Sequence, residues 1–278
     1  MADAPLILLS PAKSLDFETP APTKKAGIPR FLDDQTVELA GLLKKKTAVE
    51  LAGLMSLSAR LAELNFRRYQ SFDPAVLRRQ AKQSGRAGTG PRAASPPPGK
   101  QALWAFTGDV YQGFDAPSLK GRGIDRAERR IRILSGLYGF LRPLDLMLPY
   151  RLEMGTKLQT PRGKDLYQFW GCAITEGLAE ESPAWICNLA SQEYYRSVKE
   201  KELPCPVVHP VFQDESGGRF KVLGMFAKHA RGLMTRWLID NDVRDPGQLP
   251  EFEAGGYRFS EPESTPAKPV FRRPATAR

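Results

Sequence analysis

The sequence comprises 278 residues, of which 41% are apolar and 26% charged, so it can bury the core of one large domain or two small ones. Basic residues outnumber acidic ones by 41 to 31, and the resulting net charge of +10 is typical of proteins that bind nucleic acid. No stretch approaches the roughly 18 apolar residues of a membrane span, and the apolar run near the N-terminus is too short for a signal peptide. These features exclude a membrane-spanning or secreted class, and we expect a cytoplasmic protein.

The first third of the chain predicts one strand followed by helices. Leu6–Leu9 is a short apolar run that ends at a Ser-Pro turn, as a buried strand does. Helical spacing extends from Phe31 to Tyr69, and its last two helices are expected at Ala48–Met55 and Ala59–Tyr69. Residues 81–100 are rich in Pro and Gly and lack large apolar side chains, so we expect a disordered insert there.

The remainder of the chain mixes strands and helices without a regular alternation. Strands are expected at Ala102–Phe106, Trp185–Leu189, Pro206–Phe212 and Arg219–Phe226, the last two joined by a hairpin turn. Helices are expected at Ile124–Leu134, Lys164–Glu180 and Ala227–Asn241. The pattern predicts a mixed α/β (α+β) fold, with a central sheet and surrounding helices in a single compact domain over residues 1–260. The tail, residues 261–278, is expected to be flexible or packed along an edge of the body.

The sequence offers no recognisable metal or redox framework. Its three cysteines (Cys172, Cys187 and Cys205) form no CxxC pair, and His209 and His229 are the only histidines. Nucleotide-binding, α/β-hydrolase and zinc-protease signatures are also absent. We therefore expect neither a metal nor a cofactor.

Polar and aromatic residues gather in several short segments that follow predicted strands or open predicted helices. The segments are 10–16, 107–113, 134–155, 188–195 and 227–232. Charged side chains within such turn-rich, otherwise apolar runs are costly to bury unless they form ion pairs or serve in binding or catalysis. Two interpretations stay open: internal ion pairs that fix the loops, or a shared polar cleft that binds an anion or performs acid–base chemistry.

The shared-cleft interpretation assigns residues to two roles. The expected cleft residues are Ser10, Lys13, Asp16, Asp109, Tyr111, Arg142, Tyr150, Arg151, Asn188, Ser191 and Arg231. If the cleft is catalytic, the candidates are Lys13, Asp109, Asp145, Glu153, Glu193 and Lys228. The carboxylates would act as general acid or base, and a lysine would act as nucleophile or anion clamp.

A second candidate site is the helical pair within residues 47–69, which resembles a helix-hairpin-helix element. Such an element presents backbone N–H groups to a DNA phosphate, and basic residues flank this one. The expected DNA contacts are Lys44, Lys45, Lys46, Ser56, Ser58, Arg60, Arg67 and Arg68. Serines stand where the usual hairpin has glycines, so an ordinary helical hairpin with a solvated basic face is the alternative.

Taken together, these segments resemble the YaaA peroxide-stress family (UPF0246). SPAKSLDF, GDVYQG, LSGLYGFLRPLDLMLPYRLEMG, GKDLYQFWG, NLASQEYYRSV and AKHARGLMTRWLI occur in the order and spacing of that family. The resemblance covers nearly the whole chain, and residues 81–99 look like an insertion relative to it. It implies a compact mixed α/β domain with a helix-hairpin-helix element, a positively charged groove and the capacity to bind DNA. It also implies protection from peroxide by limiting iron-driven damage.

Two functions from different classes follow. The leading hypothesis is a monomeric stress protein that binds double-stranded DNA, bent or damaged duplexes included, largely without sequence specificity. The alternative is an enzyme that acts on a nucleotide, a damaged base or another small anion held in the polar cleft. Direct sequestration of iron is disfavoured, because the acidic residues are dispersed and histidines are scarce.

Overall fold

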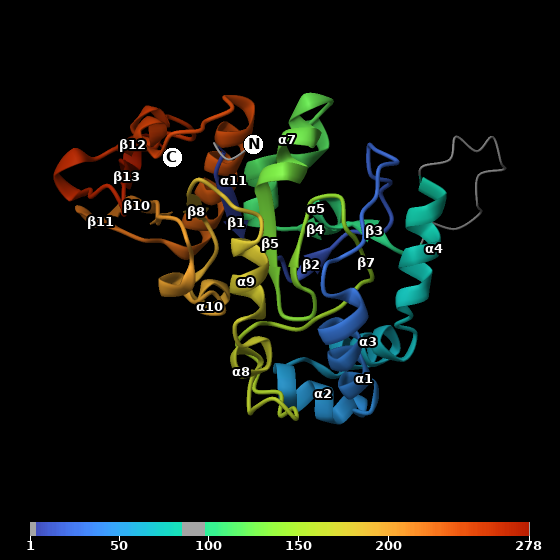
Figure 1. Cartoon of the computed structure of the whole chain (residues 1–278). Coiled ribbons are helices and arrows are strands. Elements are labelled where there is room, and N and C mark those ends of the chain that lie inside the picture. Colours follow the sequence, from blue (N-terminus) through green and yellow to red (C-terminus); the bar gives the residue numbers. More distant parts are fainter. Residues whose placement is uncertain (1–3, 85–97, 278) are drawn as a thin grey trace.

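A five-stranded sheet forms the centre of the molecule (Figure 1). In the computed structural model, which describes residues 4–84 and 98–277, its order is β6–β5–β1–β8–β9. The strands are β1 (Leu6–Leu9), β5 (Ile131–Ser135), β6 (Gly139–Leu141), β8 (Ile186–Asn188) and β9 (Val207–Val208). β1 pairs in parallel with both β5 and β8, and all four of its residues are buried. A wholly apolar run is what a strand covered on both faces requires.

A second sheet of four strands has the order β11–β10–β13–β12. Its strands are β10 (Val211–Ser216), β11 (Arg219–Lys221), β12 (Arg258–Phe259) and β13 (Val270–Arg273). Gly217 and Gly218 turn the β10–β11 hairpin with φ of 63° and 70°, which confirms the predicted turn. The tail was expected to be flexible or edge-packed, but β13 has partners on both sides and is therefore an inner strand. Two short ladders pair β2 (Ser14–Leu15) with β4 (Phe106–Thr107), and β3 (Lys100–Gln101) with β7 (Leu146–Met147).

Helices surround the sheets. They are α1 (Val37–Lys44), α2 (Ala48–Met55), α3 (Ala59–Gln70), α4 (Pro74–Ser84), α5 (Ala102–Ala105), α6 (Asp109–Phe114), α7 (Arg122–Arg130), α8 (Leu166–Trp170), α9 (Ala173–Ala179), α10 (Gln192–Tyr195) and α11 (Gly224–Asp240). In Figure 1, α1–α3 lie at the bottom of the molecule and the second sheet lies at the upper left. The mixed α/β class is thus confirmed. Within the described ranges, no helix has the length and apolar character needed to cross a membrane.

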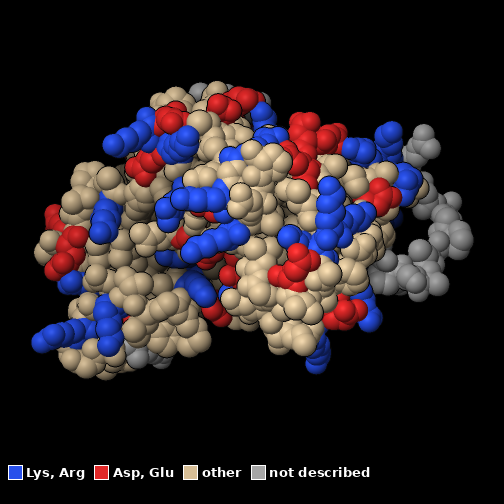
Figure 2. Space-filling view, turned by 90° about the horizontal axis from the view of Figure 1, so that it is seen from below, with Lys and Arg blue, Asp and Glu red and all other residues tan. Residues whose placement is uncertain are grey.

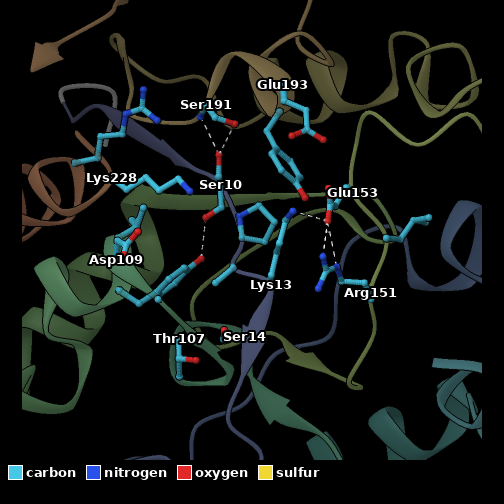
Figure 3. A pocket seen from close by; sticks show the side chains of 18 of the residues that line it. Ser10, Lys13, Ser14, Thr107, Asp109, Arg151, Glu153, Ser191, Glu193 and Lys228 are labelled. Atoms are coloured by element: carbon cyan, nitrogen blue, oxygen red, sulfur yellow. Dashed lines mark hydrogen bonds and ion pairs between the residues drawn. The ribbon is translucent and has the colours of Figure 1, made fainter. Parts of the chain in front are cut away.

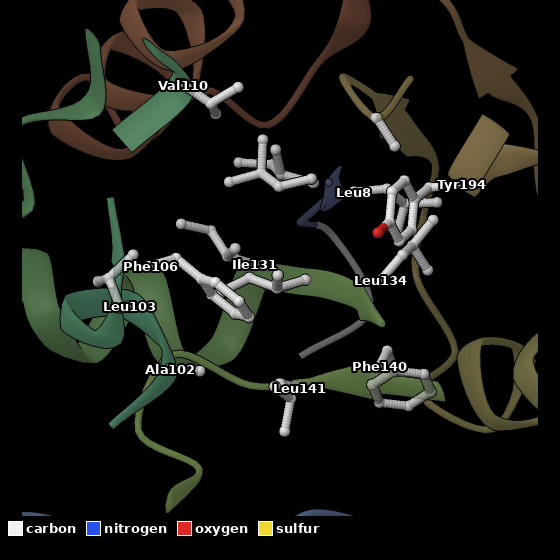
Figure 4. Packing of buried hydrophobic residues seen from close by; sticks show 14 of the residues in the cluster. Leu8, Ala102, Leu103, Phe106, Val110, Ile131, Leu134, Phe140, Leu141 and Tyr194 are labelled. Atoms are coloured by element: carbon white, nitrogen blue, oxygen red, sulfur yellow. The ribbon is translucent and has the colours of Figure 1, made fainter. Parts of the chain in front are cut away.

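Buried side chains from both halves of the chain form the core around β5 (Figure 4). Ile131 and Leu134 of β5 are fully buried, as are Leu103 of α5 and Leu141 of β6. Each such side chain contributes roughly 1.5–3 kcal/mol through removal of apolar surface from water. The core fixes the strand ends from which the polar segments emerge.

Several predicted elements are wrong in type or extent. Ala102–Phe106 is a helical turn, α5, with only Phe106 in a strand, because a short wholly buried run has no periodicity to separate the two. The helix predicted over Ile124–Leu134 ends at Arg130, and the apolar residues that follow form β5. Lys164–Glu180 is divided into α8 and α9 at Gly171, whose φ of 53° is left-handed.

The predicted strand Pro206–Phe212 and the predicted insert also differ from the structure. Residues 207–208 belong to the central sheet as β9, whereas β10 from Val211 onward belongs to the second sheet. Of the expected insert at 81–100, residues 81–84 complete α4 and Lys100 begins β3. Residues 85–97 of that insert lie outside the described residues.

Candidate functional site

The polar segments converge at one edge of the central sheet. β1 and β8 are parallel, and residues 10–14 and 191–194, which follow their carboxyl ends, enclose one side of an open cavity of about 590 Å³. Ligands of open parallel sheets bind at such strand ends. The polar residues that line this polar cavity are Ser10, Lys13, Ser14, Thr107, Asp109, Tyr111, Tyr150, Arg151, Glu153, Ser191, Gln192, Glu193, Tyr194, Lys228 and Arg231.

Ser10 links three of the segments (Figure 3). Its Oγ accepts the N–H of Ser191 at 2.8 Å and donates to the hydroxyl of Ser191 at 3.2 Å. Its main-chain carbonyl accepts the hydroxyl of Tyr111 at 3.1 Å. Burial raises the pKa of Tyr111 well above its usual value, so this phenol remains a hydrogen-bond donor at physiological pH. The polar contacts around Ser10 therefore fix the floor of the cavity.

Glu153 is held by two cations at the mouth of the cavity. Its Oε1 lies 3.0 Å from Lys13 Nζ and accepts from Arg151 Nε at 3.1 Å and from an Arg151 terminal nitrogen at 2.9 Å. Glu193 accepts the main-chain N–H of Gly155, two residues after Glu153, at 3.0 Å. With Asp109, the lining contains three carboxylates against the four cations Lys13, Arg151, Lys228 and Arg231. The cavity therefore carries one more cation than carboxylates and suits an anionic ligand.

Two helices in backbone contact carry the remaining charged residues of the lining. A Cβ on Gly232 of α11 would lie 1.9 Å from the carbonyl oxygen of Val110 in α6, so only glycine permits this close crossing. Asp109 opens α6, and Lys228 lies one turn before Gly232 on α11. Figure 3 shows Asp109 and Lys228 on the same side of the cavity. Burial lowers the pKa of Arg231 from its usual value.

Comparison with known proteins identifies the family. The family model described as "Peroxide stress protein YaaA" matches residues 6–263. The UPF0246 protein of Paraburkholderia phytofirmans is 46% identical over 274 residues, covering 96% of this chain and 98% of the relative. UPF0246 proteins of Burkholderia cenocepacia and Paraburkholderia xenovorans match at the same identity and coverage. This chain belongs to the YaaA peroxide stress protein family. All five polar segments lie within residues 6–263, the span that the family model matches.

Four residues that the sequence predicted as cleft or catalytic residues do not line the polar cavity in this YaaA-family structure. Asp145 is buried and accepts the N–H of Arg142 at 2.8 Å, and burial raises its pKa to about 7. The Arg142 guanidinium binds Glu181 in a basic hollow that includes Leu6, at the opposite end of β1. The side chain of Asn188 faces His209 and caps Ala190, which positions the loop after β8.

Asp16, the fourth of these residues, faces a separate recess of about 480 Å³ that adjoins the polar cavity. We call it the apolar recess; its lining is Asp16, Thr19, Pro20, Pro22, Lys100, Leu103, Trp104, Phe106, Thr107, Gly108, Tyr111, Gln112, Asp115, Ala116 and Pro117. Sequence reasoning missed it, because Lys100 was assigned to a disordered insert and Trp104 to a buried strand. The aromatic residues that directly follow Lys100 were the available signal.

The α2–α3 hairpin forms with α2 at its predicted bounds, and its serines cap helices. Ser56 ends α2 with a left-handed φ of 52°, and the Ser58 hydroxyl accepts the N–H of Leu61 at 3.4 Å. A capping box between Thr47 and Glu50 starts α2. A helical hairpin is therefore present, and its assignment to the helix-hairpin-helix class stays a prediction.

Several of the predicted DNA-contacting cations have partners within the hairpin. Lys46 pairs with Glu50 at 3.1 Å and Arg67 with Glu63 at 2.8 Å, whereas Lys44 donates to the carbonyl of Phe72 at 3.0 Å. Arg68 is half-buried, and desolvation lowers its pKa. Lys45 and Arg60 are exposed. Among the described residues, no group of three or more His, Cys, Asp and Glu side chains is arranged to hold a metal ion.

Proposed function

We propose that this member of the peroxide stress family binds double-stranded DNA largely without reading its sequence. The observation that carries the proposal is the convergence of Lys13, Arg151 and Lys228, from three distant parts of the chain, on one open cavity. The face seen from below in Figure 2 is hollowed near its middle, and Lys and Arg side chains gather around the hollow. Such an arrangement suits phosphates, which attract cations without regard to base identity.

The α2–α3 hairpin is the second surface that we assign to DNA. Lys45 and Arg60 are exposed there, and neither forms an ion pair with another residue that the structure describes, so a phosphate contact would break no such pair. The last turn of α3 is bonded to the cavity wall through the hydroxyl of Tyr69 and the main-chain carbonyl of Arg151. This hydrogen bond links the hairpin to the cavity wall, so one duplex could contact two surfaces that are joined to each other. We propose that the protein limits iron-driven oxidative damage by protecting DNA rather than by holding iron itself.

Fluorescence anisotropy of a labelled duplex across a salt series tests the proposal. Wild-type protein should bind at micromolar concentration or tighter at low salt, with affinity falling steeply as salt rises. Lys13→Gln with Lys228→Gln should reduce the slope of log affinity against log salt by about 1 to 2, since each phosphate contact contributes roughly 0.9 and Lys13 must exchange its pair with Glu153 for the phosphate. Lys268→Gln is the matched control, because this exposed lysine lies in the turn before β13. Equal slopes in all three proteins would refute a role for the cavity, and no binding at low salt would refute the proposal.

A second function is favoured by one specific observation: five of the six catalytic candidates line the same cavity. Asp109, Glu153 and Glu193 would supply a general acid or base, and Lys13 or Lys228 a nucleophile or anion clamp. The aldehyde of a damaged nucleotide with an opened sugar would then condense with the amine of Lys228 to form a Schiff base and release water. Borohydride should trap this adduct on a duplex with an abasic site, and Lys228→Gln should abolish it. The absence of a trapped adduct on wild-type protein would exclude this chemistry.

A further inference from the structure

The apolar recess is lined by aromatic rings and prolines and by one ion pair. Its walls come from Trp104, Phe106 and Tyr111, together with prolines of the segment after β2 and of the 116–118 turn. The indole N–H of Trp104 donates to the carbonyl of Ala116 at 3.1 Å, which fixes the plane of the ring. Phe106 and Tyr111 lie 5.5 Å apart, centroid to centroid. Flat rings held in place favour a planar ligand, because stacking then costs little conformational freedom.

An ion pair between buried Lys100 and partly exposed Asp16 forms the polar edge. The Lys100 side chain is only 7% exposed, and its Nζ lies 3.3 Å from Asp16 Oδ2. The other carboxylate oxygen of Asp16 accepts the N–H groups of Glu18 and Thr19, each at 2.9 Å. An ammonium has three hydrogens to donate, so the pair can serve a ligand with both a donor and an acceptor. Burial of the Lys100 ammonium costs free energy that Asp16 offsets, and the exposed part of Asp16 leaves the pair accessible to a polar ligand.

The recess and the polar cavity share a wall. Thr107, Gly108 and Tyr111 line both, and the hydroxyl of Tyr111 is already engaged by Ser10. An apolar slot with a hydrogen-bonding edge thus lies beside a cation-rich cavity, and a nucleotide has the corresponding two halves. We propose that the apolar recess binds the base of a single unstacked nucleotide while its phosphates occupy the polar cavity. This inference rests on the proposed function, since it adds a base site to a DNA-binding protein.

The recess selects a class of ligand rather than one base. The aromatic walls accept the face of any base, and stacking on aromatic residues is tolerant of sequence. Lys100 would donate to a ring nitrogen or a carbonyl, and Asp16 would accept from an amino or imino group. Duplexes with a bulge or mismatch release a base at lower cost than paired DNA, so they are the expected partners.

The test compares three labelled duplexes: fully paired, with one bulged adenosine, and with a bulged tetrahydrofuran abasic analogue in its place. The last two share phosphates and flexibility and differ only in the base. Wild-type protein should bind the bulged adenosine about tenfold more tightly than the analogue. Equal affinity for the bulged adenosine and for the abasic analogue, together with normal binding of paired DNA, would refute the base site but not the proposed function.

Two variants locate the effect. Thr19→Trp, at the exposed rim, should fill the recess, and Lys100→Met should remove the ammonium while keeping its apolar stem. Both should bring the affinity ratio to about one and leave the affinity for paired DNA unchanged, whereas Lys268→Met should behave as wild type. An unchanged ratio in a folded Thr19→Trp protein would refute the assignment, whatever the stability of Lys100→Met. If no duplex binds, the proposed function fails, and the base site is then tested by itself through calorimetric titration with adenosine and with ribose. Binding of adenosine but not of ribose would support the base site, and binding of neither would refute it.

Discussion

The hydroxyl of Tyr69 donates a 2.6 Å hydrogen bond to the main-chain carbonyl of Arg151, which ties α3 to the wall of the polar cavity. Tyr69 is 1% exposed, and burial raises its pKa far above the usual value of a phenol. The residues are 82 positions apart in the chain, so the bond joins the hairpin to a distant segment. The two surfaces proposed to contact DNA are therefore held in a fixed relation.

Tyr69→Phe should lower the free energy of unfolding by about 1–3 kcal/mol, because the carbonyl of Arg151 loses its donor in a buried place. Tyr167→Phe is the matched control: its hydroxyl bonds the carbonyl of Glu193 at 2.9 Å near the surface, where water can replace it. Urea denaturation of both variants measures the difference. A Tyr69→Phe protein as stable as Tyr167→Phe would contradict the importance of this link.

Gly232→Ala should lower the free energy of unfolding by about 3 kcal/mol or more, because the new methyl group would meet the main chain of Val110 and Phe114. Gly41→Ala in α1 should instead raise the free energy of unfolding, by about 0.5–1 kcal/mol. Outside the backbone of its own helix, no atom would lie within 4 Å of the added methyl group. Thermal melting of both variants distinguishes them. Similar melting temperatures would show that the α6–α11 crossing can relax.

Local signals made the N-terminal helices predictable. α2 begins after Thr47, and the capping box that Thr47 forms with Glu50 spans only four consecutive residues. α3 begins after its N-cap, Ser58. The β10–β11 turn was equally local, since two glycines separate its strands. By contrast, the sequence could not separate α7 from β5, because Arg130 is followed directly by apolar residues that fit either element.

Which residues line the polar cavity depends on the topology of the sheet, which the sequence did not reveal. Tyr150, Arg151 and Glu153 line the polar cavity, whereas Arg142, from the same predicted polar segment, lies in the hollow at the opposite end of β1. Only the sheet order determines which strand ends meet, and that order joins residues far apart in the chain. The apolar recess was equally hidden, since Asp16 and Lys100 are 84 positions apart and meet only through the β2–β4 and β3–β7 ladders.

Asp145 should make stability depend on pH between about 4 and 7. Burial raises its folded-state pKa to about 7 from an ordinary value of 3.8, so the unfolded chain releases this proton at a lower pH than the folded protein does. The contribution of Asp145 to stability is then greatest below pH 4 and falls as pH rises towards 7, by at most about 1.4 kcal/mol per pH unit. Asp145→Asn, which stays neutral, should remove this slope.

Burial also raises the pKa of Glu128, so part of the same trend should persist in the Asp145→Asn protein. The informative quantity is therefore the difference between wild type and variant, measured by urea denaturation at each pH. Parallel curves from pH 4 to 7 would show that Asp145 titrates in the folded protein as it does in the unfolded chain.

Within the hairpin, Lys45 and Arg60 should contribute more to DNA binding than Arg67 and Arg68. The first two are exposed, whereas Arg67 is paired with Glu63 and Arg68 is half-buried, so either would have to exchange existing contacts for a phosphate. Lys45→Ala with Arg60→Ala should reduce the salt slope of duplex binding by about 2, and Arg67→Ala should reduce it by less than 1. Anisotropy titrations of the two proteins measure both slopes. A larger effect from Arg67→Ala would show that the Glu63 pair opens on DNA, and no effect from either protein would confine the DNA surface to the polar cavity.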